Sequence, residues 1–297
     1  MTTGNRPTRA SCALAVLVAG TLALAASCGG SGPHAPGGEP ASLLVARTLG
    51  GEAAVRSGRV ALSLSLQAPG ARRAFTLHSA ARFRIGAVNM APSLALTLVT
   101  VSHDGSGPAR ALRATLVSSA GGISLSLQGR RMPAGPQAQR ALQAGYGRLA
   151  TVPGGGHGAT APLGLDASAW LADPRFASAA PGLARDRVHV RAGLALAPFL
   201  ADVGRLVSLS SGLEQATGRA GSSAPALALW HAARTESGAG TVDLYADPGG
   251  QLPRSLTASV GLHGGPGTAG RSAAPVSVSL RMRFSGLGRP AAGGGAS

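Results

Sequence analysis

Alternation of apolar and polar residues is the feature that most restricts what this 297-residue chain can fold into. The clearest case begins at Ser57, after which the apolar members of the alternation are Val60, Leu62, Leu64 and Leu66 and the small or polar members are Ala61, Ser63, Ser65 and Gln67. A period of two with one apolar side is typical of an antiparallel strand that buries only one of its faces.

Four further segments before residue 130 repeat this pattern. Their apolar positions are Phe75, Leu77, Ser79, Ala81, Phe83 and Ile85; Leu94, Leu96 and Leu98; Leu112, Ala114 and Leu116; and Ile123, Leu125 and Leu127. Turns rich in Gly, Pro and Asp separate the segments, which predicts a meandering sheet with a continuous aliphatic face. Alternation returns later over residues 187–194, 226–232, 241–246, 254–262 and 276–284.

Helical spacing of apolar residues occurs between the two groups of strands and once before them. It predicts helices over residues 41–51, 136–150 and 197–209. The last of these has Asp202 and Arg205 on its polar face. Residues 210–223 are expected to be the frayed end of that helix and a loop. A short helix that carries Trp170 and Leu171 is expected between a capping Asp166 and Pro174. The fold class predicted is α+β: a curved antiparallel half-barrel sheet packed on central helices around one core.

The N-terminal segment has the layout of a secretory signal. Arg6 and Arg9 precede an uncharged stretch that ends in Ala25, Ala26, Ser27 and Cys28. A bacterial lipobox has this form, and it would join the Cys28 thiol to diacylglycerol, with palmitate-type acyl chains that hold the protein on a bilayer. Leu24 lies one position further from the cysteine than is usual, so the alternative is an ordinary signal peptide that leaves Cys28 as a free thiol. The apolar run is shorter than the roughly 18 residues of a transmembrane span.

These patterns divide the chain into four parts. Residues 1–27 are predicted to be a lipoprotein signal peptide, and residues 28–40, rich in Gly, Pro and Ser, a flexible tether. Residues 41–290 form a single domain, and residues 291–297 a disordered tail. The expected location is the outer face of the cell membrane, in the cell envelope, with the lipid on Cys28 as the anchor.

The charge is strongly basic and is carried by arginine alone. The chain has 27 basic residues, none of them lysine, against 11 acidic residues, for a formal net charge of +16. Such a surface attracts anionic head groups or acidic wall polymers. The arginines are scattered and are not interleaved with stacking aromatic residues, so nucleic acid is not a predicted partner.

No match to a catalytic or metal-binding motif has the sequence context that its chemistry requires. Residues 265–270 match GxGxxG but lie between two alternating segments, which indicates a hairpin loop. His103 and Asp104 have no GxSxG serine to act with, and Asp243 and Asp247 are interpreted as an outward strand residue and a turn residue. The sequence contains neither an HExxH motif nor a CxxC pair, which are spacings typical of metal ligands. The sequence therefore predicts a protein that is not an enzyme and has no catalytic residues, metal or cofactor.

Four segments, in order, resemble the actinobacterial lipoproteins of the LppX/LprG type. They are LGLDASAWLADPRF, GLARDRVHVRAGLALAPFLADVGRL, VDLYADPGGQLPRSLTASV and VSVSLRMRFSGLGRP, and that family also has a lipobox. The closing FSGLGRP is not followed by the further strand typical of the family. The resemblance implies a half-open barrel on helices, with a hydrophobic cavity that holds acyl chains. Carried onto this chain, the resemblance implies that the cavity is lined by Leu62, Leu64, Leu77, Leu94, Leu96, Phe199 and Val203.

The function that follows from the resemblance is lipid transport: a membrane-anchored lipoprotein that binds lipid or lipoglycan and passes it on, with an envelope transporter of unknown identity as a further partner. The alternative is a structural or interaction lipoprotein with a solid core, which binds a partner protein or an anionic wall polymer through its basic surface. An apolar space of several hundred cubic ångströms between sheet and helices would favour the carrier.

Overall fold

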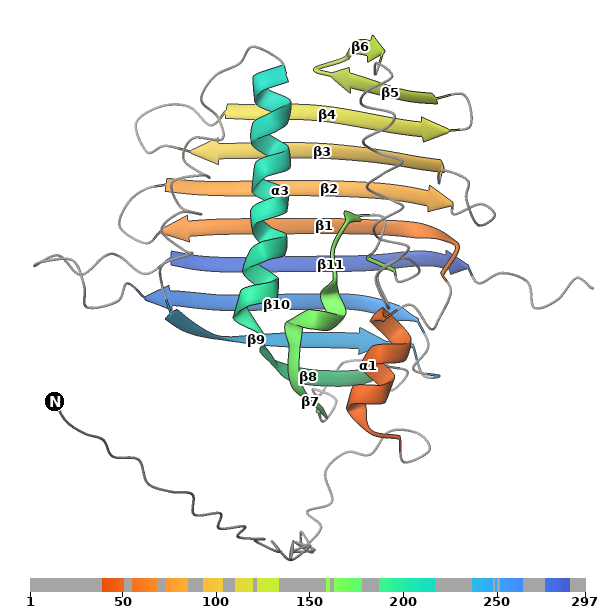
Figure 1. The fold of residues 1–297 in the computed structure, drawn as a ribbon, viewed down its shortest axis with the longest axis vertical. Coiled ribbons are helices and arrows are strands. Elements are labelled where there is room, and N and C mark those ends of the chain that lie inside the picture. Colours follow the sequence, from red (N-terminus) through yellow and green to blue (C-terminus); the bar gives the residue numbers. More distant parts are fainter. Residues whose placement is uncertain are drawn as a thin grey trace, which may run out of the picture. The chain divides into compact units, whose positions relative to one another are not determined.

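The computed structural model describes residues 39–50, 55–68, 73–84, 93–103, 110–119, 122–133, 159–160, 163–177, 187–216, 237–247, 249, 252–263 and 276–288. These residues form an antiparallel sheet with two α-helices and a short 3₁₀ helix (Figure 1). The strands are β1 Ser57–Ala68, β2 Arg73–Arg84, β3 Ser93–His103, β4 Arg110–Ser119, β5 Gly122–Leu127, β6 Arg130–Pro133, β7 Leu171–Phe176, β8 Val188–Leu194, β9 Ser237–Ala246, β10 Pro253–His263 and β11 Val276–Gly288. The helices are α1 Ala41–Leu49, η2 Ala167–Trp170 and α3 Leu196–Ala216.

The eleven described strands lie in the order β6-β5-β4-β3-β2-β1-β11-β10-β9-β8-β7. Each half is a meander of consecutive strands, and the halves meet where β1 pairs antiparallel with β11, with Leu64 opposite Leu280. Among the described strands, β6 and β7 each have one neighbour, so the sheet they form is not closed. The prediction of one large antiparallel sheet with helices, and of a meander from β1 to β5, is confirmed.

The apolar positions of the alternation form one face of the sheet, which we call the inner face. On β11, for example, Val276, Val278, Leu280, Met282 and Phe284 are buried and the residues between them are exposed. α3 runs across the strands (Figure 1), and its Phe199, Val203 and Val207 belong to the same core cluster as the inner face. Burial of this aliphatic surface is the main contribution to stability.

The region after Asp166 differs from the prediction. A 3₁₀ helix ends at Trp170, and Leu171 and Pro174 lie in the edge strand β7. An edge strand tolerates Pro174 because proline lacks only the N–H that would face away from the sheet. Asp166 makes no side-chain cap and instead accepts a hydrogen bond from the Ser168 hydroxyl at 2.6 Å. β6 was likewise not predicted.

Three further observations concern the length of α3, the predictions that fall outside the described residues, and membrane-spanning helices. α3 continues to Ala216, beyond the predicted end at residue 209. The predicted helix over residues 136–150, the strand over 226–232, Cys28 and the tail 291–297 lie outside the described residues. Within the part of the chain that the structure describes, no helix has both the length and the hydropathy to cross a membrane.

Candidate functional site

The seven residues predicted to line a cavity lie together on the inner face and on α3. Leu62, Leu64, Leu77, Leu94, Phe199 and Val203 are each at most 4% exposed, and Leu96 is partly buried against them. They come from β1, β2, β3 and α3, so the structure brings all of them into one apolar cluster. That they contact a lipid stays a prediction.

One apolar row crosses the inner face from β11 to β5. Consecutive members face each other in the register, in the order Phe284, Val60, Ala81, Leu96, Leu116 and Leu125. We call these six residues the inner row. Five strand spacings of about 4.8 Å give it a length of about 24 Å. Its first three members are buried and its last three are half-buried, so the row becomes more accessible toward β5.

The inner face also contains a few buried hydroxyl groups. Ser79 on β2, Thr100 and Ser102 on β3, and Ser118 on β4 are each at most 5% exposed. Among the described residues the Ser79 hydroxyl has no hydrogen-bond partner, and its neighbours on the adjacent strands are the apolar Leu62 and Leu98. A buried hydroxyl without a partner costs about 1–3 kcal/mol. Ser79 is thus a free polar group within an apolar surface.

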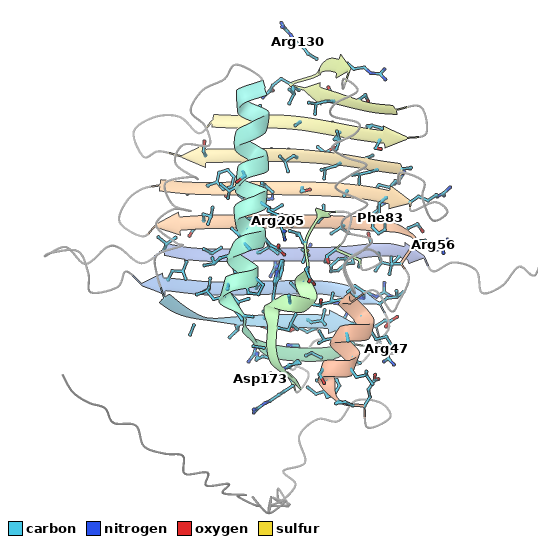
Figure 2. All side chains as sticks on the ribbon, viewed as in Figure 1. Arg47, Arg56, Phe83, Arg130, Asp173 and Arg205 are labelled. Atoms are coloured by element: carbon cyan, nitrogen blue, oxygen red, sulfur yellow. The ribbon has the colours of Figure 1, made fainter. Side chains whose placement is uncertain are left out.

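Asp202 connects α3 to the segment that contains η2. Its carboxylate accepts hydrogen bonds from the Trp170 indole nitrogen and from the Asp166 backbone N–H, each at 3.0 Å, and pairs with Arg205. Trp170 also packs edge-on against Phe199, with ring centroids 5.4 Å apart. The placement of Asp202 on an exposed helix face was therefore wrong: the residue is 2% exposed. Arg205, which is labelled beside α3 in Figure 2, is 63% exposed, as a residue of the polar face should be.

The opposite, outer face of the sheet carries the arginines of the alternating pattern. A groove of about 970 Å³ lies there, and its charged residues are Arg59, Arg82, Arg187, Arg254, Arg281 and Arg283. We call it the arginine groove. Ala61, Ala80 and Ala95 also line it, together with hydroxyl groups that include those of Ser255, Thr257 and Tyr245. A second hollow of about 460 Å³ adjoins it and shares Arg281 and Arg283.

Strand register brings these arginines together. Arg59 on β1 pairs directly with Arg82 on β2, and Arg283 on β11 pairs with Ala61, two residues along the same face of β1 from Arg59. On β10 the register against β9 shifts between Pro253 and Ser255. At this bulge Arg254 is exposed while Pro253 and Leu256 remain buried, so the irregularity directs an additional arginine to the outer face.

A polar cluster borders the arginine groove on β8 and β9. The His189 Nε2 lies 2.7 Å from the Asp243 Oδ1, and the Arg191 Nε donates to the same oxygen at 3.0 Å. His189 stacks on Tyr245, which lines the groove, with ring centroids 4.3 Å apart. His189 lies on the outer face, as the alternation predicts, but its side chain is buried. Asp243 is therefore already paired and does not offset the charge of the groove.

The sequence did not indicate the groove as a site. Its arginines are separated by up to 224 residues, between Arg59 and Arg283, and they are spread over β1, β2, β10 and β11 and the residue before β8. Regular alternation would have placed five of them on the outer face, and Arg254 with the buried Leu256 on the inner face. It would not have shown that the six lie close together. Among the described residues, no group of three or more His, Cys, Asp or Glu could hold a metal ion. The GxGxxG match at residues 265–270 lies outside those residues.

Comparison with known proteins identifies no family. No family model matches the chain, and no curated protein matches it. Among solved structures, one similar chain comes from a study of lipid–protein interactions in lipovitellin, with a TM-score of 0.32 and 10% sequence identity. That match covers 82% of this chain and 26% of the lipovitellin chain.

Proposed function

We propose that this chain is a non-enzymatic lipoprotein that binds and carries lipid or lipoglycan acyl chains at the cell envelope. The observation that supports this most is the inner row. It is about 24 Å long, which is comparable with an extended fatty acyl chain, and it is formed only by hydrocarbon side chains. Acyl chains need a long apolar surface of this kind rather than precisely placed polar groups.

The geometry at the two ends of the row supports a direction of entry. α3 passes over the strands from β9 to β4, and β5 lies to one side of the end of the helix (Figure 1). Leu96, Leu116 and Leu125, on β3, β4 and β5, are the half-buried members of the row. An acyl chain would enter from the β5 side and lie toward Val60. Ser79, two residues before Ala81 on the same face of β2, would offer its free hydroxyl to an ester carbonyl.

The anchoring part of the proposal depends on the N-terminal sequence. Cleavage before Cys28 and attachment of diacylglycerol would place the domain on the outer face of the cell membrane. A tether over residues 28–40 would keep the inner face within reach of the bilayer. Resemblance to the LppX/LprG lipoproteins supports the same arrangement, with an envelope transporter as a further partner.

Native mass spectrometry of the protein purified from a bacterial membrane tests both parts. We expect an added diacylglyceryl mass on Cys28 and a non-covalent lipid that organic extraction releases. Leu116→Trp would fill the row and remove the non-covalent lipid. Its matched control is Val117→Trp, since Val117 is the next residue on β4 and is 40% exposed on the outer face. Absence of lipid from the unaltered protein, or equal lipid in both variants, would contradict the carrier function.

A second candidate is an interaction lipoprotein without a ligand in its core. It is favoured by the complete burial of Leu64, Leu77 and Phe199, which is also the property of a solid core. The same extraction separates the two candidates, because a solid core would release no lipid from either variant or from the unaltered protein.

A further inference from the structure

We infer that the arginine groove on the outer face is a binding site for a linear polyanion that carries several phosphate groups. The side chains of the six arginines and of the inner row lie on opposite faces of the sheet, although Val60, Ala81 and Phe284 of the inner row also contribute to the lining of the groove. The inference therefore stands whether or not the inner face binds lipid, and it concerns a different ligand.

The first argument is uncompensated charge. Six arginines line the groove, and within the described part of the chain none of them has a carboxylate partner. The acidic residue that borders the groove, Asp243, is held by His189 and Arg191. Arg59 and Arg82 stand directly opposite each other in the register, an arrangement that destabilises a sheet. A bound anion would remove this repulsion.

The second argument is the chemistry of the lining. The guanidinium group donates in a planar fork that matches two phosphate oxygens at once, and it remains charged at all physiological pH values. Hydroxyl groups of Ser255, Thr257 and Tyr245 supply neutral donors between the arginines. The alanine side chains in the lining leave room for a ligand to approach the backbone. These are the features of a phosphate site rather than of a general solvated surface.

The third argument is shape. The groove has a volume of about 970 Å³ and continues into the adjoining hollow of about 460 Å³. Five of its arginines lie on β2, β1, β11 and β10, which spans three strand spacings or about 14 Å, and the sixth, Arg187, directly precedes β8. A single phosphate ion would contact only part of that length. A flat bilayer surface would contact the rims of the hollow but not its alanines, whereas a flexible chain of phosphates can lie along it.

Isothermal titration of the purified protein with a short linear polyphosphate tests the inference. The groove variant is Arg59→Gln/Arg82→Gln/Arg283→Gln. Its matched control is Arg113→Gln/Arg130→Gln/Arg131→Gln, which removes the same charge from exposed positions of β4 and β6. We expect the groove variant to lose about tenfold or more in affinity, since several charge-assisted hydrogen bonds disappear. The control should change by less than about twofold, mainly at low salt.

Two other ligands are tested beside polyphosphate: inorganic phosphate, and vesicles that contain phosphatidylglycerol. The inference requires that polyphosphate bind more tightly than inorganic phosphate and that the groove variant keep the circular dichroism spectrum of the unaltered protein. It would be overturned if both triple variants lost affinity equally, because binding would then follow net charge alone. Equal affinity for inorganic phosphate would reduce the site to a single-anion site. Binding to vesicles with none to polyphosphate would make the groove a membrane-docking surface instead.

Discussion

On β1 and β11 the two faces of the sheet can be compared pair by pair, since Leu64 faces Leu280 on the inner side and Ser63 faces Arg281 on the outer side. The inner pair is fully buried and neutral, and the outer pair is polar and carries a charge. Both pairs belong to the same antiparallel strand pairing. The inner face stabilises the fold by burying apolar side chains. The outer face brings arginines such as Arg59 and Arg82 close together, and their repulsion lowers stability.

The largest expected effect comes from the inner face of β1. Leu64→Ala should lower the free energy of unfolding by about 3 kcal/mol, because it removes buried hydrocarbon and leaves a cavity in the center of the sheet. Urea denaturation measures the change. Ser65→Ala, the adjacent residue on the outer face, should stay within about 0.5 kcal/mol. Equal effects at the two positions would break the distinction between the faces.

A somewhat smaller loss is expected where α3 joins the inner layer. Asp202→Ala should cost about 2–3 kcal/mol, because the buried Trp170 indole and the Asp166 N–H lose their acceptor. Asp202→Asn keeps one acceptor oxygen and should lose less. Thermal unfolding followed by Trp fluorescence measures both. A negligible effect of Asp202→Ala would mean that α3 is held by its apolar contacts alone.

A gain in stability is expected at the free hydroxyl of the inner face. Ser79→Ala should raise the free energy of unfolding of the lipid-free protein by about 1 kcal/mol, since a buried group without a partner is removed. Ser63→Ala on the neighbouring strand, whose side chain lies on the outer face, serves as the control and should change little. A loss of stability in Ser79→Ala would show that the hydroxyl is hydrogen-bonded in solution.

The smallest effect concerns repulsion on the outer face. Arg82→Thr should raise stability by a few tenths of a kcal/mol at low salt, because Arg59 loses a like charge opposite it. The gain should disappear at high salt, where such exposed charges are screened. Arg113→Thr on β4, outside the groove, should show no comparable salt-dependent gain. Calorimetric melting at two salt concentrations distinguishes these outcomes.

The local pattern of apolar and polar residues was sufficient to predict most of the strands. Val60 to Gln67 and Val276 to Phe284 alternate so regularly that both the strand and its buried face follow from the sequence. It failed at β7, where Asp173 and Pro174 are typical of a turn and only the neighbouring β8 makes the segment a strand. It failed also at Asp202, because its partners Trp170 and Asp166 are more than thirty residues away.

The sequence by itself determined which side of each strand is apolar, since a period of two is a property of the extended backbone and needs no partner. Only the tertiary structure decided which strands are neighbours. Pairing of β1 with β11, and the bulge at Arg254, bring six separate arginines into one groove. Hydrogen bonding between strands sets that register, and it is a relation between distant segments that no local pattern contains.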